Sequence, residues 1–262
     1  MHNLKGKTVF ITGASSGIGK AAAHMFARNK TNLILVARRA ERIQELSIEL
    51  KKKYKIDVFI GKLDVRSYSA VKKFVSKLPD KWKKIDILLN NAGLSRGLNK
   101  IQDGILADWE EMIDTNVKGL LYVSKEVIPL MLKNKRGHII NIGSIAGHEV
   151  YTAGNVYCAS KHAVDAITKG MRMDLIDTPI KVSTIDPGLV NTEFSLVRYH
   201  GDKKRADNTY NGMTPLKAED VAEAIEFIAT RSKEVNVAEI ILFPKAQAAS
   251  TVVLRKILKS TS

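Results

Sequence analysis

Short, fully apolar runs alternate with longer amphipathic stretches along most of the chain. The apolar runs predict buried β-strands at 8–12, 33–37, 58–60, 85–89, 138–142, 180–185 and 239–243. Between them, apolar residues recur at helical spacing, as Ile43, Leu46 and Leu50 do. The predicted helices are a first one that ends near residue 28, and then 39–53, 67–78, 107–133, 156–177 and 218–230.

Strands that are apolar throughout and separated by helices predict a parallel sheet covered on both faces. With right-handed crossovers, this becomes a doubly wound, Rossmann-type α/β fold of about seven strands. No linker interrupts the pattern, so residues 1–262 are expected to form a single domain. The stretches 94–104 and 188–216 lack a clear periodicity. Long segments after a strand often carry function, so 188–216 is the predicted substrate loop.

The net charge of +15 is the unusual bulk property of the chain. A basic balance attracts nucleic acid, acidic membranes or small anions. Many lysines lie near predicted helix ends, where cations suit the helix dipole. Aromatic residues make up only 6% of the chain, which argues against a base-stacking surface. We therefore expect a solvated basic surface, no nucleic-acid or membrane partner, and a small, anionic substrate.

Cysteine content and the chain ends bear on location. Cys158 is the single cysteine, which excludes an internal disulfide, and the spacings of zinc sites are absent, so no metal is expected. The polar start, 1–7, does not look like a signal peptide, and we expect a cytoplasmic protein. The tail, 245–262, mixes apolar and basic residues. It suits either a short helix that docks on a neighbouring subunit or a frayed end.

A glycine-rich turn joins the first predicted strand to the first helix. Its spacing, G-x-x-x-G-x-G, lets a pyrophosphate approach the backbone at a helix N-terminus, which supplies N–H groups and a positive dipole end. Polar residues at the ends of the third and fourth strands would border the same crevice. The predicted dinucleotide contacts from these segments are Gly13, Ser15, Ser16, Gly17, Ile18, Gly19, Asp64, Val65, Asn91, Ala92 and Gly93.

The end of the second strand indicates which dinucleotide binds. An NAD site usually has an acidic residue there, which bonds the ribose 2′-hydroxyl. This chain has Arg38 and Arg39, and no carboxylate stands at that position. Guanidinium groups suit a 2′-phosphate. The sequence therefore predicts NADP(H) as the cofactor.

Residues suited to alcohol–carbonyl chemistry follow in order. Asn116 lies in the long predicted helix, Ser144 follows the fifth strand, and Tyr157 and Lys161 share one face of the next helix. A phenol has a pKa of about 10, and a neighbouring ammonium lowers it toward the range of a useful acid–base group. Ser144 can donate to a substrate oxygen. These residues suit alcohol–carbonyl interconversion, with Tyr157 as the proton donor and acceptor.

Taken together, these motifs resemble the short-chain dehydrogenase/reductase family over nearly the whole chain. The matching segments are 12–19, 90–93, Asn116, Ser144, Tyr157-x-x-x-Lys161 and Pro187-Gly188. The resemblance implies that Asn116 helps to hold a water connecting Lys161 to solvent, and that Lys161 holds the nicotinamide ribose. It implies a homotetramer. It also implies that the nicotinamide carboxamide is covered by Pro187, Gly188, Val190 and Thr192.

Longer stretches, at 137–147, 154–158, 187–198 and 244–248, resemble one branch of that family. This branch contains the NADP-dependent 3-hydroxy acid dehydrogenases, also called serine or L-allo-threonine dehydrogenases. The resemblance implies oxidation of L-serine, L-allo-threonine or 3-hydroxypropionate, or reduction of malonic semialdehyde. Such a carboxylate needs a cation, for which Arg198 is the candidate and Arg96 a second one. A general carbonyl reductase and a non-catalytic NADP sensor are the alternatives.

Overall fold

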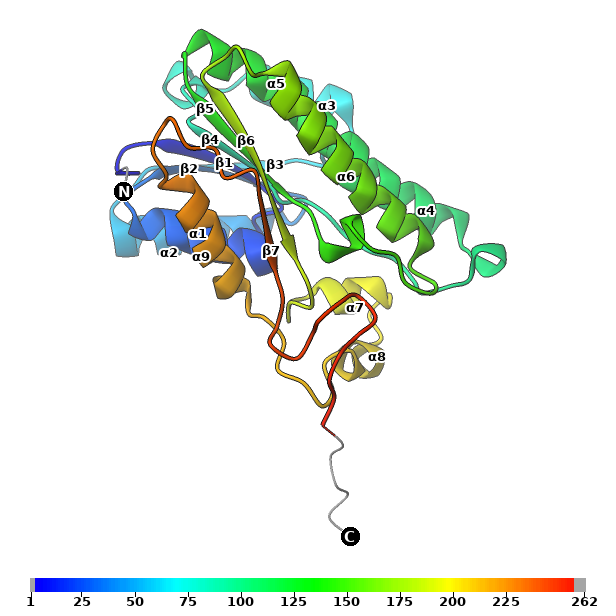
Figure 1. Ribbon diagram of the computed structural model, residues 1–262. Helices are drawn as coiled ribbons and strands as arrows, with labels where there is room; N and C mark the ends of the chain where they lie inside the picture. Colours follow the sequence, from blue (N-terminus) through cyan, green and yellow to red (C-terminus); the bar gives the residue numbers. More distant parts are fainter. Residues whose placement is uncertain (1–2, 257–262) are drawn as a thin grey trace.

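The computed structural model describes residues 3–256 and arranges them in three layers, with a sheet between two layers of helices (Figure 1). Seven parallel strands form the sheet in the order β3-β2-β1-β4-β5-β6-β7. The strands are β1 (Thr8–Thr12), β2 (Asn32–Ala37), β3 (Val58–Lys62), β4 (Ile87–Asn90), β5 (Gly137–Ile142), β6 (Ile180–Pro187) and β7 (Glu239–Leu242). The predicted doubly wound sheet is confirmed.

Helices cover both faces of the sheet (Figure 1). One face carries α1 (Gly17–Arg28), α2 (Ala40–Tyr54) and α9 (Ala218–Ala229). The other carries α3 (Tyr68–Ser76), α4 (Leu106–Ile113), α5 (Gly119–Lys133) and α6 (Asn155–Asp174). Val9 and Ile11 of β1 pack into the first core, whereas Phe10 packs into the second. Because successive strand residues enter opposite cores, both faces of the central strands are buried and mostly apolar.

The helix predicted over 107–133 is not uniform. Between α4 and α5 the chain makes one turn of π-helix, Asp114–Lys118, which contains Asn116. Asn116 is almost fully buried, with 2% of its surface exposed. Such turns are rare and often lie at functional sites. Helical periodicity did not reveal this turn because the apolar pattern continues through it.

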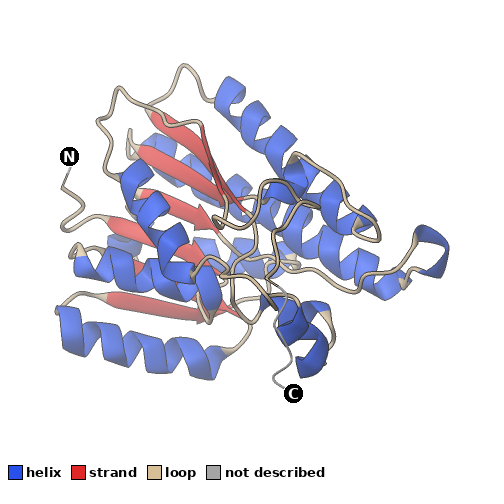
Figure 2. Ribbon diagram, turned by 60° about the horizontal axis from the view of Figure 1, so that its bottom comes forward, coloured by secondary structure: helices blue, strands red, loops and turns tan. Residues whose placement is uncertain are grey.

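Loops gather across the carboxyl ends of the strands, as Figure 2 shows. The predicted substrate loop, 188–216, contains two short helices, α7 (Phe194–Arg198) and α8 (Lys203–Asn208). The tail turns back beside it, with an antiparallel bridge between Gln247 and Val253 and a hydrogen bond from Lys256 N to Gly212 O of 2.8 Å.

The tail contains no helix in residues 245–256, so a docking helix is wrong for this part, and 257–262 lie outside the described residues. None of the helices in the described part of the chain is long and apolar enough to cross a bilayer.

Candidate active site

A cavity of about 430 Å³ opens at the carboxyl end of the sheet. In doubly wound folds, ligands bind in this crevice, where the strand order reverses between β1 and β4. The structure brings all but one of the predicted cofactor contacts to its wall. Those that line it are Gly13, Ser15, Ser16, Gly17, Ile18, Arg38, Arg39, Asp64, Val65, Asn91, Ala92, Gly93, Tyr157, Lys161, Pro187, Gly188, Val190 and Thr192.

Gly19 is the predicted contact that does not line the cavity. A Cβ at this position would lie 2.5 Å from Gly13 O and 2.5 Å from Asn91 Nδ2. Asn91 Nδ2 itself donates to Thr12 O at 2.9 Å and to Gly13 O at 3.1 Å. Gly19 therefore acts through packing, because the absence of a side chain lets α1 approach the glycine-rich turn and the end of β4.

The two arginines after β2 border one end of the cavity. Arg39 donates from Nη2 to Ser15 Oγ at 3.1 Å and to Ser16 Oγ at 2.8 Å, and it pairs with Glu193 at 2.7 Å. Arg38 pairs with Glu111 at 3.1 Å. Guanidinium and hydroxyl donors at one rim form a site suited to a phosphate. Neither carboxylate was predicted from the sequence, since Glu111 and Glu193 lie in segments distant from β2.

Ser144, Tyr157 and Lys161 converge on the same cavity, and all three are buried. Burial raises the pKa of Tyr157, while the charge of Arg198 and a hydrogen bond with Ser144 oppose that rise. Lys161 donates from Nζ to Ile142 O at 2.9 Å, and burial lowers its pKa to about 8. The hydroxyls of Ser144 and Tyr157 and the amine of Lys161, with its pKa of about 8, therefore face the same cavity.

Asn116 lies behind the cavity wall. Its Oδ1 accepts from Leu94 N at 2.8 Å, and its Nδ2 donates to Leu94 O at 2.8 Å and to Ser160 Oγ at 3.0 Å. The amide thus fixes the segment after β4 against α6. Gly93 separates Asn116 Oδ1 from Lys161 Nζ, since a Cβ there would lie 3.3 and 3.7 Å from these atoms. The predicted link through a water stays a prediction.

Arg198 also acts on Tyr157, because its charge opposes the rise in the Tyr157 pKa that burial causes. The predicted effect of Lys161 on Tyr157 stays a prediction. The guanidinium carbon of Arg198 lies 5.2 Å from the centre of the Tyr157 ring and 5.1 Å from that of Phe194. Arg198 donates to Ser95 Oγ and to Tyr151 OH, both at 3.1 Å. It therefore packs on residues of the cavity wall without lining the cavity itself.

Arg96, the second candidate for a carboxylate anchor, does line the cavity. Its Nε pairs with Glu111 Oε2 at 2.7 Å, and its Nη1 donates to Val197 O at 2.7 Å. Its charge is therefore compensated. Arg198 has no carboxylate partner within the described residues.

Fold and site define an oxidoreductase that acts on CH–OH groups, and the chain belongs to the short-chain dehydrogenase family, whose model matches residues 7–201. The NADP-dependent 3-hydroxy acid dehydrogenase of Schizosaccharomyces pombe is 45% identical over 257 residues, 98% of this chain and 99% of that protein. Sulfoacetaldehyde reductase 2 of Chromohalobacter salexigens is 44% identical over 241 residues, 92% and 95% of the two chains.

Solved structures show the same similarity. The closed form of serine dehydrogenase complexed with NADP⁺ has a TM-score of 0.88 and 40% identity, and the match covers 95% of this chain and 100% of that chain. Serine dehydrogenase from Escherichia coli has a TM-score of 0.80 and 38% identity, with 92% and 99% covered. The predicted family and branch resemblance is confirmed.

Proposed function

We propose that this protein transfers a hydride between NADP(H) and the 3-hydroxyl or 3-oxo carbon of a small 3-hydroxy acid. The proposed substrates are L-serine, L-allo-threonine and the pair 3-hydroxypropionate and malonic semialdehyde. The observation that carries this substrate class is the position of Arg198. Its guanidinium lies against the proposed acid–base residue, Tyr157, and its charge is not compensated by any carboxylate in the described residues.

The residues of the crevice fit NADP(H). The glycine-rich turn leads into the N-terminus of α1, where backbone N–H groups and the helix dipole suit a pyrophosphate. Arg39, Ser15 and Ser16 already form a hydrogen-bonded group at the rim, which suits the 2′-phosphate. When bound, the nicotinamide supplies or accepts the hydride.

The chain's own residues handle the oxygen and its proton. Since Ser144 and Tyr157 line the same cavity, one substrate oxygen could accept from both hydroxyls. In reduction, Tyr157 gives its proton to that oxygen as the hydride arrives at the carbon. Lys161 lies buried against the end of β5, where its charge favours the phenolate that this step leaves behind.

The relatives support an anionic substrate. Serine and the 3-hydroxy acids carry a carboxylate near the reacting carbon, and sulfoacetaldehyde, which another relative is named for reducing, carries a sulfonate. An arginine beside the reacting group suits either anion. The net charge of +15 would also draw such substrates toward the protein.

The absorbance of NADPH tests this proposal directly. Purified protein is given NADP⁺ or NAD⁺ with L-serine, L-allo-threonine, 3-hydroxypropionate or a plain secondary alcohol, and NADPH with malonic semialdehyde or sulfoacetaldehyde. We expect turnover of the anionic substrates with the phosphorylated cofactor. Turnover of the plain alcohol alone would refute the proposed substrate class and leave the reaction type intact.

A general carbonyl reductase is the second candidate. Leu94, Phe194 and Val197 line the cavity near Tyr157, and their side chains would also suit an apolar ketone or aldehyde. In such a reductase every proposed catalytic residue would have the same role, but Arg198 would not bind a substrate carboxylate. A higher kcat/KM for apolar ketones than for 3-oxo acids would favour it.

Arg39→Ala should lower kcat/KM for NADP⁺ by about 10- to 100-fold and leave that for NAD⁺ nearly unchanged. The change removes a charge-assisted contact, worth about 1.5–3 kcal/mol, that only the 2′-phosphate would make. Initial rates with both cofactors measure it. Arg42→Ala is the matched control, because Arg42 pairs with the same Glu193 but does not line the cavity. Equal losses for both cofactors would contradict the assignment.

Oxidation should accelerate as the pH rises, whereas reduction should be favoured at neutral and mildly acidic pH. Burial raises the pKa of Tyr157, so at neutral pH it is the phenol that donates a proton in reduction. Oxidation needs the phenolate, whose fraction grows with pH. Initial rates in both directions, from mildly acidic to alkaline pH at constant ionic strength, check this. An oxidation rate that does not change with pH would contradict it.

We also propose a cytoplasmic homotetramer. On α5 and α6, large apolar side chains are exposed, among them Leu121, Leu132 and Met173, and exposed apolar patches often mark subunit contacts. Light scattering should give about four times the chain mass of 29.0 kDa. A mass equal to that of one chain would refute the tetramer.

A further inference from the structure

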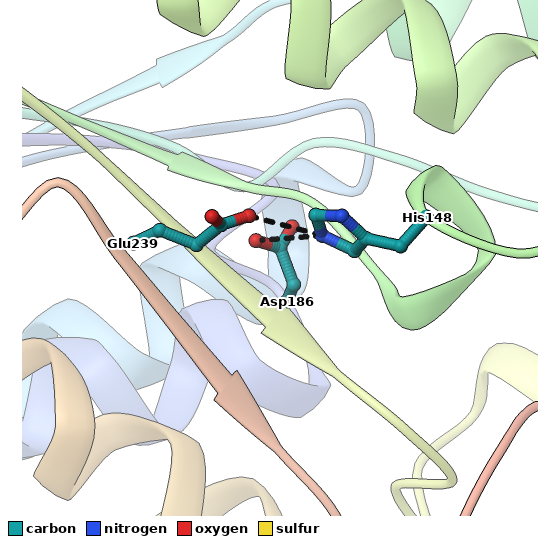
Figure 3. Close-up of side chains that lie close together, drawn as sticks. All are labelled: His148, Asp186 and Glu239. Carbon is teal, nitrogen blue, oxygen red and sulfur yellow. Dashed lines mark ion pairs between the residues drawn. The ribbon is translucent and has the colours of Figure 1, made fainter.

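Three ionisable side chains from separate elements meet, as Figure 3 shows. His148 follows the 3₁₀ turn Ile145–Gly147, Asp186 lies near the end of β6, and Glu239 begins β7. His148 Nε2 is 3.3 Å from Asp186 Oδ2 and 3.1 Å from Glu239 Oε1. Because the three come from separate elements, no spacing in the sequence indicated that they meet.

The other oxygen of Asp186 faces the active site. Asp186 Oδ1 accepts from the backbone N–H of Ser144 at 3.0 Å and from Thr184 Oγ1 at 3.1 Å. Gly143 leaves room for this contact, since a Cβ there would lie 1.7 Å from Asp186 Oδ1. The carboxylate thus occupies the space that a side chain at position 143 would fill, and only 2% of Asp186 is exposed.

One carboxylate therefore holds the segment Ser144–His148 at both of its ends. Within the segment, Ser144 Oγ accepts from Ala146 N at 3.1 Å and donates to Pro187 O at 3.4 Å. Pro187 is the neighbour of Asp186 in β6. The direction of the Ser144 hydroxyl is consequently set by contacts that run through Asp186 and the residue next to it.

We propose that Asp186 is a positioning residue for Ser144, kept in place as a carboxylate by its ion pair with His148, whose imidazole is fixed in turn by Glu239. The proposal rests on the proposed role of Ser144 in binding the substrate oxygen. An imidazole placed between two carboxylates can supply the compensating charge that a buried carboxylate needs. A hydrogen bond from the Ser144 N–H to an ionised oxygen is stronger than one to a neutral oxygen.

The charges around Asp186 make its effect depend on pH. Burial and the charge of Glu239 raise the pKa of Asp186 to about 6, and His148 opposes this rise. The charge of Asp186 also acts on two residues of α6. It opposes the lowering of the Lys161 pKa by burial, and it adds to the rise in the Tyr157 pKa. As the pH falls through about 6, Asp186 becomes protonated, and its hold on both Ser144 and His148 weakens.

Asp186→Asn should lower kcat by about 10- to 100-fold, because a small displacement of an orienting donor costs that much. The amide keeps the size of the side chain and removes the charge. The KM for the cofactor and NADPH binding by fluorescence should not change. In a Ser144→Ala background the same substitution should have almost no further effect, since a residue that acts through Ser144 has nothing left to position.

Asp86→Asn is the matched control. Asp86 is 5% exposed, accepts from Thr8 N at 2.9 Å and pairs with Arg136 at 2.8 Å. It lies just before β4, at the amino ends of the strands, whereas the cavity is at their carboxyl ends. This variant should keep its kcat per folded molecule, with folding followed by thermal unfolding. Equal losses of kcat in Asp86→Asn and Asp186→Asn, or additive losses in Ser144→Ala with Asp186→Asn, would overturn the proposal.

The pH profile separates positioning from a purely structural role. His148→Gln removes the side chain that opposes the rise in the pKa of Asp186, so the fall of kcat on the acidic side should begin about one pH unit higher. Asp186→Asn should abolish this fall. An unchanged limb in both variants would overturn the proposal. So would activity that EDTA removes and Zn²⁺ restores, which would make the cluster a cation site.

If the wild type turns over only the plain alcohol, the proposed substrate class fails, and the same comparisons test Asp186 with that alcohol.

Discussion

Replacing Tyr157 with phenylalanine should lower kcat by about 10²- to 10⁴-fold in both directions, the range that one positioned acid–base group contributes. The substitution removes the hydroxyl and keeps the ring. That ring packs at 5.6 Å from Phe194 and beneath Arg198, so the wall of the cavity should survive. NADPH fluorescence and thermal unfolding should therefore remain close to those of the wild type, while turnover is lost.

Tyr68→Phe is the control for the loss of a tyrosine hydroxyl. Tyr68 OH donates to Glu126 at 2.8 Å, between α3 and α5 and outside the cavity. This variant should turn over substrate at the wild-type rate. If Tyr157→Phe kept more than about a tenth of the wild-type kcat, another group would have to supply the proton, and the assignment of Tyr157 would fail.

The sheet was predictable because its central strands are buried on both faces. Runs such as Val9-Phe10-Ile11 have no polar face, and only a parallel sheet between two helical layers gives every residue of such a run an apolar neighbour. The cavity followed from the same topology, since parallel strands bring their carboxyl ends to one edge. The glycine-rich turn and the Tyr157–Lys161 pair lie on elements that this topology fixes, so their meeting could be expected.

Contacts between distant segments were not predictable. Glu111 and Glu193 reach the arginines after β2 from α4 and from the start of α7, and no local pattern encodes those ion pairs. Short helices such as α7 and α8 depend on tertiary contacts, because isolated helices of that length are unstable. The Asp186 cluster depends on where β6 ends and where β7 begins, and boundaries are the part of a strand that periodicity defines least.

Arg198→Met should lower kcat/KM for 3-hydroxypropionate by about 10- to 100-fold relative to its effect on a plain secondary alcohol. The guanidinium would form a charge-assisted hydrogen bond with the substrate carboxylate, worth about 1.5–3 kcal/mol, and methionine keeps much of the apolar stem. Ser95 and Tyr151 hold Arg198 through Nε and Nη2, and Nη1 has no hydrogen bond within the described residues. That nitrogen is the donor that we assign to the carboxylate.

The ratio of kcat/KM for 3-hydroxypropionate to kcat/KM for the plain alcohol separates the carboxylate contact from an effect on the pKa of Tyr157. Arg198 also opposes the rise in the pKa of Tyr157, so its loss should raise that pKa further and shift oxidation of both substrates to higher pH. Since the plain alcohol has no carboxylate, its oxidation rate should change only through the pKa of Tyr157.

Arg96→Met is the competing test, because Arg96 lines the cavity but is paired with Glu111. Arg96→Met could change the ratio of kcat/KM for 3-hydroxypropionate to that for the plain alcohol while Arg198→Met does not. The substrate carboxylate would then bind at Arg96, in the loop after β4, and the assignment to Arg198 would be wrong.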